Sequence, residues 1–180
     1  MPDATPMTPL AFRLGPTAEA APAFYRVTKE VHFCYGHRLL NYDGKCRNLH
    51  GHNGKAVIAL EAPQLDGLGM VVDFSEIKRV IGKWIDDVLD HKMLLHRDDP
   101  VIPEMRRTGE PFVELDVNPT AENIARLIFD RAAEHGLPVI EVTLWETENS
   151  FAAYRPQGTP ADAKPIEMHI VAGSGKNGFV

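Results

Sequence analysis

The chain has 180 residues, a formal net charge of −6 and 24% charged residues, as expected for one domain with tails. This acidic balance argues against general binding to nucleic acid or to anionic membranes, and no run approaches the roughly 18 apolar residues needed to span a bilayer. The start of the chain lacks the pattern of a secretory signal, so we expect a cytoplasmic protein with reduced cysteines.

Two strands are predicted in the first part of the chain. Residues 1–23 are rich in proline, alanine and threonine, and we expect them to form a flexible extension. Alternating β-formers then predict a strand over 24–37. A polar loop around Gly44 separates it from a second strand over 54–61, with Ala56, Ile58 and Leu60 on one face. We expect the two strands to pair as a hairpin with a long connection.

Two helices are predicted in the middle of the chain. Asp73 can cap the first, with Glu76 three residues on as in a capping box, and apolar residues follow at helical spacing: Phe74, Ile77, Ile81, Trp84, Ile85 and Val88. The second begins at Asn118-Pro119-Thr120, where proline is tolerated, and ends at Gly136. Between the helices, residues 96–117 contain three prolines and are expected to form an irregular, polar insert.

Two further strands complete the predicted domain, one over 139–146 and one over 151–155. The order is ββααββ, and hairpin strands with helices between them favour an α+β fold over a doubly wound one. We therefore expect a four-stranded antiparallel sheet in a domain over 24–156. The remainder, 157–180, is rich in glycine, proline and alanine, and we expect a C-terminal tail without regular structure.

Three histidines near the first two strands form a candidate metal site. His50 and His52 are separated by one residue, and in extended chain such side chains point to the same side. His37 ends the preceding strand, where a hairpin can bring it alongside. Three neutral imidazoles leave a zinc ion with an open fourth position, which is typical of a catalytic site. A short HxH pattern can be accidental, but the proximity of His37 and of Cys46 favours the metal.

The two cysteines have different predicted roles. Cys34 lies in the first strand beside Phe33, and we interpret it as a small core residue, the commoner fate of a free cysteine. Cys46 could be a fourth zinc ligand, but a ligand thiolate would close the site, so we favour a free thiol. Three cations lie near it in the sequence and could either bind phosphate groups or form solvated surface: Arg38, Lys45 and Arg47.

Two further polar features have both a structural and a functional interpretation. Glu146 ends an apolar row on the third strand, where an unpaired buried carboxylate is costly, so it either has a partner or reaches solvent at the strand end. Asp90-His91 joins a carboxylate to an imidazole, a pair that favours the charged ring. From the residues alone, a surface pair that closes a helix is the better explanation of Asp90-His91.

Several short motifs carry a resemblance to one family. The main ones are Phe33-Cys34-Tyr35-Gly36-His37-Arg38-Leu39 and Lys45-Cys46-Arg47-Asn48-Leu49-His50-Gly51-His52-Asn53, followed in order by motifs at 69–74, 89–91, 118–123 and 145–147. Over residues 24–154 the sequence resembles the 6-pyruvoyl-tetrahydropterin synthase family, which includes bacterial 6-carboxy-tetrahydropterin synthases. The resemblance implies the tunnelling fold, with two helices on one face of the sheet. It also implies trimeric rings stacked into a homohexamer, with active sites between subunits.

The resemblance implies a catalytic role for most of the candidate residues. It assigns the zinc ligands, which are His37, His50 and His52, and it leaves Cys46 free to act as a base. A free thiol has a pKa of about 8.5 and needs help to act as a base near neutrality. The implied helper is His91, polarised in turn by Asp90.

Three residues are implied to hold the substrate. A carboxylate can accept the two adjacent N–H donors of a 2-amino-4-oxopterin edge, and the resemblance assigns this role to Glu146. Thr120 and Glu122 are expected to line the pterin pocket, although helix capping explains Thr120 equally well.

The resemblance also implies a reaction. The substrate would be 7,8-dihydroneopterin triphosphate, and the spacing of Cys46 from His50 favours formation of 6-carboxy-tetrahydropterin, acetaldehyde and triphosphate, for queuosine or other 7-deazapurine synthesis. A pyruvoyl product, or cleavage of another pterin side chain, is the alternative within the family. A non-catalytic zinc- or pterin-binding module is the alternative of another class. The sequence departs from the family pattern at Tyr35-Gly36 and at Gly54.

Overall fold

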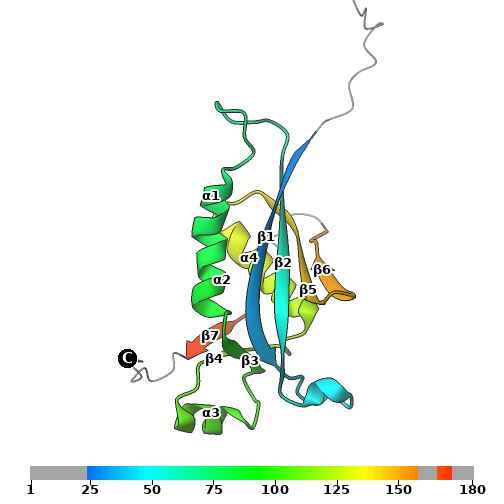
Figure 1. Ribbon diagram of the computed structural model, residues 1–180, viewed down its shortest axis with the longest axis vertical. Coiled ribbons are helices and arrows are strands. Elements are labelled where there is room, and N and C mark those ends of the chain that lie inside the picture. The colour runs from blue at the N-terminus through cyan, green and yellow to red at the C-terminus, as the bar shows by residue number, and fades with distance from the viewer. Residues whose placement is uncertain (1–23, 158–165, 172–180) are drawn as a thin grey trace, which may run out of the picture.

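The computed structural model describes residues 24–157 and 166–171. Two long strands dominate it, β1 (Tyr25–His37) and β2 (His50–Ala62), which pair antiparallel along their whole length (Figure 1). The register places Tyr35 opposite His52 and His37 opposite His50. The connection between them contains a short 3₁₀ turn, η1 (Lys45–Arg47). The predicted hairpin is confirmed, and β2 begins earlier than expected because the HGHN segment is itself part of the strand.

Both predicted helices are present. The first is a continuous helical segment made of α1 (Phe74–Ile77), a π-helical turn η2 (Lys78–Gly82) and α2 (Lys83–Val88). Its cap is the predicted Asp73, whose carboxylate accepts a hydrogen bond from the Ser75 N–H at 2.7 Å. The predicted capping box is not formed, because Glu76 bonds Arg79 instead. The second helix is α4 (Ala121–Glu134), capped by Thr120.

The sheet is larger than predicted and is mixed. Two strands, β5 (Val139–Thr147) and β6 (Ser150–Tyr154), extend the β1–β2 pair on the β2 side, and all of these pairings are antiparallel. On the other side lie β3 (Lys92–His96), β4 (Phe112–Leu115) and β7 (Met168–Val171). The order is β6-β5-β2-β1-β3-β4-β7, and β3 runs parallel to both β1 and β4. The purely antiparallel sheet of four strands was therefore a wrong prediction.

The segment predicted as an irregular insert is instead regular structure. Residues 96–117 include the end of β3, the helix α3 (Ile102–Thr108) and β4. Pro103 lies in the first turn of α3, where a missing N–H costs no helical hydrogen bond. Gly109 ends the helix with a positive φ of 76°, a conformation that glycine adopts without strain. In the predicted tail, β7 pairs antiparallel with β4. The predicted extension over 1–23 lies outside the described residues.

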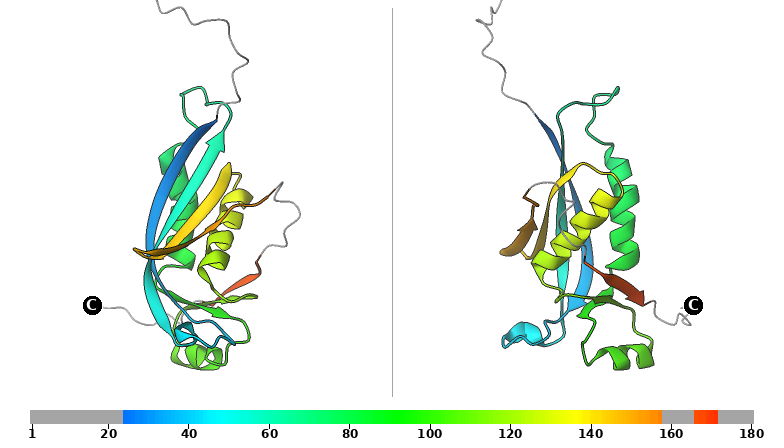
Figure 2. Two further views of the ribbon diagram at one scale, coloured as in Figure 1. Left: turned by 90° about the vertical axis from the view of Figure 1, so that its right-hand side faces the viewer. Right: turned by 180° about the vertical axis from the view of Figure 1, so that it is seen from behind.

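The helical segment α1–η2–α2 and the helix α4 cover one face of the sheet, as Figure 2 shows, whereas α3 lies at one end of the molecule. The core lies between these helices and the sheet. It includes alternate apolar residues of β2 and β5 and the inward side of α4, all with 0% exposure: Ile58, Leu60, Val142, Leu144, Ile124 and Ile128. Each such side chain stabilises the fold by about 1.5–3 kcal/mol through burial. Within the described ranges, none of the helices is long and apolar enough to cross a membrane.

Candidate functional site

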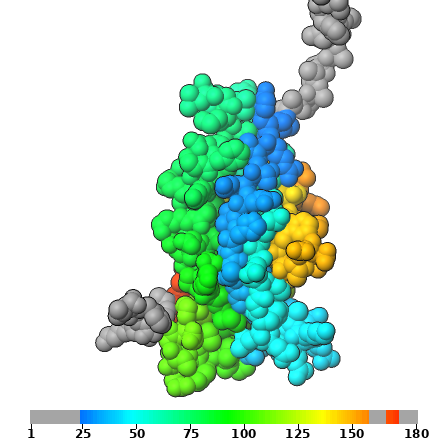
Figure 3. All heavy atoms as spheres, viewed as in Figure 1, coloured from blue at the N-terminus to red at the C-terminus, as the bar shows by residue number. Residues whose placement is uncertain are grey.

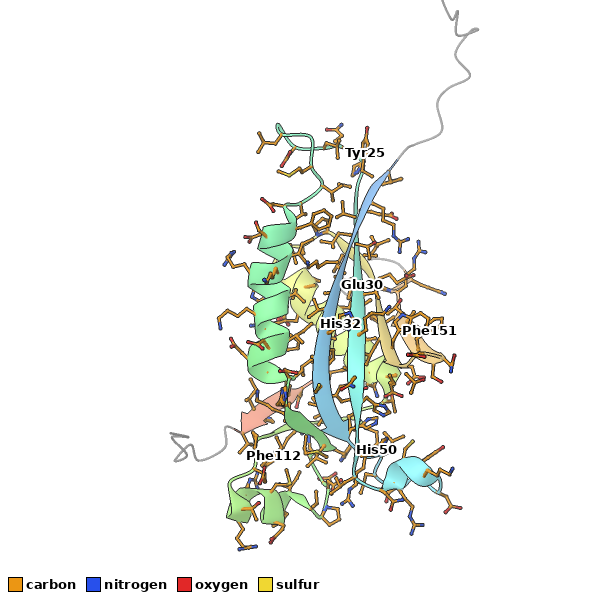
Figure 4. All side chains as sticks on the ribbon, viewed as in Figure 1. Tyr25, Glu30, His32, His50, Phe112 and Phe151 are labelled. Atoms are coloured by element: carbon orange, nitrogen blue, oxygen red, sulfur yellow. The ribbon has the colours of Figure 1, made fainter. Side chains whose placement is uncertain are left out.

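Three imidazole rings converge at one end of the β1–β2 ladder. His37 is the last residue of β1, and His50 and His52 open β2 on the same face of the sheet. The Nε2 atom of His37 lies 3.0 Å from that of His50 and 3.1 Å from that of His52. His37 is only 2% exposed. Figure 4 shows the labelled His50 at the end of the sheet nearest to η1. The predicted approach of the three histidines is present.

The hydrogen bonds of two of these rings, His37 and His50, leave their Nε2 atoms available to a metal. His37 Nδ1 lies 2.7 Å from the Pro119 carbonyl, and His50 Nδ1 lies 2.7 Å from the Asn48 carbonyl. Because a carbonyl oxygen only accepts, each Nδ1 carries the proton and each neutral Nε2 has a free lone pair. Burial lowers the pKa of His37, which also favours its neutral form.

The Nε2 lone pairs of neutral His37 and His50 face one another at 3.0 Å and repel unless a cation lies between them. Two nitrogens bound tetrahedrally to zinc at 2.0–2.1 Å are about 3.3 Å apart, close to the separations found here. His37, His50 and His52 therefore form a group that can hold a metal ion. Three nitrogens leave a tetrahedral ion one open position.

A pocket of about 330 Å³ adjoins the histidines. Its walls include His37 of β1 and residues of η1, α4, β5 and β6. Four of the other predicted site residues line it: Cys46, Thr120, Glu122 and Glu146. Cys46 is partly exposed within η1. Thr120 both caps α4 and lines the pocket, so its two interpretations are compatible. The loop that leads from His37 towards η1 is fixed by Asn118, whose side chain bonds the backbone N–H and carbonyl of Leu40.

Glu146 has a buried partner that sequence analysis missed. Its Oε1 atom accepts a hydrogen bond from the Tyr35 hydroxyl at 2.9 Å and lies 3.8 Å from His37 Nε2 and 4.0 Å from His52 Nε2. Burial raises the pKa of Tyr35 well above its usual range, and the Glu146 carboxylate raises it further, so the phenol stays a donor. The period of β1 places Tyr35 on the same face as Phe33 and His37, but it does not identify Glu146 as the partner.

Asp90 and His91 lie away from the pocket. His91 Nδ1 is 2.6 Å from Asp90 Oδ2, and Asp90 Oδ1 accepts from the backbone N–H of Cys34 at 2.7 Å. Burial raises the pKa of Asp90, but the hydrogen bonds from Cys34 and His91 outweigh it and hold this pKa below its usual range. Cys34 and His37 are three residues apart on β1, so their side chains point to opposite faces. Within one chain, the structure does not bring His91 to Cys46.

His91 and Cys34, which lie near Asp90, are distinguished by their backbone conformation and exposure. His91 adopts a positive φ of 56°, which is uncommon for a residue with a Cβ and is often found at functional sites. Its side chain is 78% exposed. Cys34 is exposed as well, and its thiol lies 3.2 Å from Asn53 Oδ1. The prediction that Cys34 is a core residue was therefore wrong.

The three cations near Cys46 have different environments. Arg38 bonds Asp99 through two nitrogens, with its Nε 2.7 Å from Asp99 Oδ2, and Asp99 is a buried residue. Arg38 is thus engaged in a structural ion pair. Lys45 and Arg47 are exposed on η1.

Comparisons with known proteins agree on one family. The family model described as 6-pyruvoyl tetrahydropterin synthase matches residues 26–157. The chain is 39% identical over 133 residues to the 6-carboxy-5,6,7,8-tetrahydropterin synthase of Rickettsia felis, covering 70% of this chain and 96% of that protein. It is 32% identical over 139 residues to the protein of the same name from Haemophilus influenzae, covering 73% and 99%.

Two solved structures share the fold. An uncharacterised protein of Wolinella succinogenes superimposes with a TM-score of 0.63 at 28% identity, covering 75% of this chain and 99% of that one. The 6-pyruvoyl tetrahydropterin synthase of Caenorhabditis elegans superimposes with a TM-score of 0.57 at 21% identity, covering 75% and 97%. Because the family model and the relatives span most of the described domain, the chain belongs to the 6-pyruvoyl tetrahydropterin synthase family.

Proposed function

We propose that the protein is a zinc-dependent lyase that converts 7,8-dihydroneopterin triphosphate to 6-carboxy-tetrahydropterin, releasing acetaldehyde and triphosphate. The observation that carries the proposal is that three imidazole nitrogens able to bind a metal lie at one pocket together with a thiol and a carboxylate. The relatives named 6-carboxy-5,6,7,8-tetrahydropterin synthase favour this reaction over the pyruvoyl alternative. The pathway we propose is queuosine or other 7-deazapurine synthesis in the cytoplasm.

The pocket residues suit recognition of a pterin. Glu146 is 22% exposed in its side chain and lines the pocket, so its carboxylate can accept the two N–H groups at the 2-amino edge of the ring. Thr120 and Glu122 line the same pocket from the start of α4. We assign ring binding to Glu146 and contacts along the wall to the other two.

The histidine group and Cys46 suit the side-chain chemistry. His37, His50 and His52 would hold zinc, which supplies Lewis-acid polarisation of the substrate hydroxyls when bound. Cys46 lines the pocket but does not belong to the metal group of three histidines. It is therefore available to remove a proton from the substrate side chain, and we assign it the role of base.

We further propose that each active site is completed by a second copy of the chain. Cys46 lines the pocket beside β6, whereas Asp90 and His91 lie with Cys34 next to β1. The two positions lie on different faces of β1, because the Cys34 thiol points away from the face that carries His37. His91 of a neighbouring copy, polarised by its own Asp90, would favour the thiolate of Cys46.

The sheet has edges that suit such an assembly. β3 pairs with β1 only at 35–37, so in the described residues no strand pairs with that edge of β1 over 25–34, and β6 pairs only with β5. The free edge of β1 borders a groove of about 720 Å³ whose other wall is the helical segment from Ser75 to Asp86 (Figure 3). Pairing β6 of one copy with β1 of the next is head-to-tail, and contacts of this kind form a ring when the rotation between copies closes. Two stacked trimeric rings would form the homohexamer.

The reaction is tested with purified protein and 7,8-dihydroneopterin triphosphate. We expect bound zinc by elemental analysis and 6-carboxy-tetrahydropterin by mass spectrometry. A pyruvoyl product would select the alternative within the family. Zinc-free protein that leaves the substrate unchanged would refute the proposal. The Cys46→Ala variant separates an enzyme from a binding module: we expect it to retain zinc and to lose turnover.

The shared site is tested by complementation. We expect Cys46→Ala and His91→Ala each to be inactive alone, because each removes one half of every site. When the two variants are co-expressed, some sites combine an intact Cys46 with an intact His91 from the neighbour. Random assembly into rings makes about a quarter of the sites complete, so about a quarter of the activity should return. No recovery in mixed oligomers would place both residues in the same chain's site.

A further inference from the structure

Tyr35 is a buried aromatic residue at the edge of the metal group. It is 3% exposed, and its ring stacks on Phe33 at a centroid distance of 5.3 Å. On its other side the ring meets His37 edge-on at 5.4 Å, and across the ladder it lies 5.7 Å from the ring of His52. The side chain carries one polar atom, its hydroxyl, which donates to Glu146 Oε1 at 2.9 Å. The ring is thus held by its neighbours and the hydroxyl has a fixed position.

Gly54 provides the space that the Tyr35 ring occupies. A Cβ at position 54 would lie 2.8 Å from Tyr35 Cε1, a separation too short for two carbon atoms, and 3.5 Å from Phe33 Cε1. Gly54 stands opposite Phe33 in the β1–β2 ladder, two residues after His52, which stands opposite Tyr35. The large residue on β1 and the missing side chain on β2 therefore form one packing unit, and these are two of the positions at which the sequence departs from the family pattern.

The hydroxyl of Tyr35 restrains a carboxylate that lies within reach of the metal group. Glu146 Oε1 is 3.8 Å from His37 Nε2 and 4.0 Å from His52 Nε2, the nitrogens that would bind the ion. Carboxylate oxygens are ordinary zinc ligands, and a fourth protein ligand would close the open position on which catalysis depends. A hydrogen bond from a rigid donor keeps Oε1 engaged and fixes the plane of the carboxylate.

We propose that Tyr35 is a positioning residue that holds Glu146 away from the metal and oriented to bind the pterin ring. The proposal rests on the proposed function, because it assumes both a metal at the histidines and a pterin at Glu146. Without the hydroxyl, Glu146 can turn towards the ion and become its fourth protein ligand. The carboxylate would then be lost to the substrate.

The test uses the full chain loaded with cobalt(II), because zinc has a filled d shell and no visible spectrum. Tyr35→Phe keeps the ring and its packing and removes only the hydroxyl. We expect a changed visible absorption spectrum of the bound cobalt and about tenfold weaker binding of the dihydropterin substrate, as for the loss of one hydrogen bond to a charged group. Tyr154→Phe removes the same atom from a residue of β6 that packs on Phe129, and it should change neither property.

The double variant Tyr35→Phe/Glu146→Gln shows whether Tyr35 acts through Glu146. The amide introduced by Glu146→Gln is a poor ligand for zinc or cobalt, so the double variant should regain the cobalt spectrum of the parent. Gly54→Ala offers an independent route, because it displaces the Tyr35 ring, and it should give the spectrum of Tyr35→Phe.

The outcomes separate this proposal from the proposed function. An unchanged cobalt spectrum in Tyr35→Phe overturns the positioning role, even where substrate binding falls. A spectral change that persists in the double variant overturns it too, because Glu146 is then not the group released. A spectral change in Tyr35→Phe, combined with a parent protein that does not turn over the substrate, refutes the reaction and leaves the role of Tyr35 at the metal standing. A parent that binds no cobalt refutes both.

Discussion

The ion pair between Arg38 and Asp99 provides a sharp test of how the end of the sheet that carries the three histidines is stabilised. Arg38 follows His37 at the end of β1, and Asp99 lies in the turn between β3 and α3. The Asp99 side chain is 0% exposed and accepts hydrogen bonds from two nitrogens of Arg38 and from the Val101 N–H at 2.9 Å. The perturbation is Arg38→Met, which keeps the aliphatic stem and removes the charge.

The expected cost follows from the burial of Asp99. With Arg38 gone, the carboxylate keeps only the Val101 N–H among these donors, and breaking a buried pair on one side costs about 3–5 kcal/mol. The matched control is Arg107→Met, which breaks a similar two-nitrogen pair with Glu104 on α3. Both partners of that pair are exposed, at 71% and 57%, so solvent screens the pair and the control should cost far less than Arg38→Met.

The deficit of Arg38→Met should depend on pH in a defined direction. In the parent, burial raises the pKa of Asp99, but the hydrogen bonds from Arg38 and Val101 outweigh it and hold this pKa below its usual range. Asp99 therefore contributes stability above its unfolded pKa of about 3.9, and this is lost as pH falls through the lower folded value. In the variant, the pKa of Asp99 should rise, because burial is no longer opposed by Arg38.

The assay is urea unfolding with a chelator, at pH 7 and at pH 4.5, so that metal binding does not contribute. The free energy of unfolding should be lower in Arg38→Met by about 3–5 kcal/mol at pH 7. The deficit should shrink at pH 4.5. Protonation of Asp99 then removes the unpaired buried charge from the variant, whereas Asp99 of the parent stays ionised and paired with Arg38. A deficit no larger than that of Arg107→Met, or one that is equal at both pH values, would refute this reasoning.

Three further predictions concern the metal group, the loop beside it and the core. His52→Ala should abolish the stabilisation by zinc, which amounts in the parent to about 2.7 kcal/mol at a hundredfold excess of zinc over its Kd, and thermal scans with and without chelator measure it. Asn118→Ala removes both hydrogen bonds to the Leu40 backbone, 2.7 and 2.9 Å long, and should cost about 1–3 kcal/mol in urea unfolding. Ile58→Ala leaves a cavity at a fully buried position and should cost about 2–5 kcal/mol by the same assay, whereas an unchanged midpoint would contradict the core assignment.

The parts of the fold that follow from local rules were predicted correctly. The alternation in β1 and β2, the caps Asp73 and Thr120 and the same-face geometry of an HxH pair need only the period of an extended chain or the orphan N–H groups of a helix start. The strands β3, β4 and β7 were missed. β3 and β4 are short and pair in parallel with segments that are not joined to them by a hairpin.

The prolines of the insert misled the prediction for a physical reason. A proline breaks a helix in its interior but is tolerated in its first turn, and Pro103 occupies such a position in α3. Proline also excludes a residue from a central strand, yet Pro111 stands just before β4 and not within it. Composition alone therefore could not separate an irregular insert from a compact unit of strand, helix and strand.

The candidate site was predictable to the extent that it depends on single strands. His37 and Tyr35 share a face, and Cys34 lies on the other, so period two alone predicts that Cys34 points away from the metal group. The contact between Tyr35 and Glu146 joins strands far apart in sequence, with β2 between them, and no local pattern specifies it. The position of His91 depends on the turn after α2, whose left-handed backbone has no sequence signature such as glycine.

The pairing of β1 with β2 has a consequence for folding. A shift of one residue between the two strands would turn His50 and His52 to the face opposite His37, because side chains alternate with a period of two. Alignments shifted by an odd number of residues therefore cannot assemble the three nitrogens around one ion. A metal ion present while the chain folds would bind and stabilise the β1–β2 hairpin with the native register over hairpins with a shifted register. The ion would then contribute to correct folding as well as to the reaction.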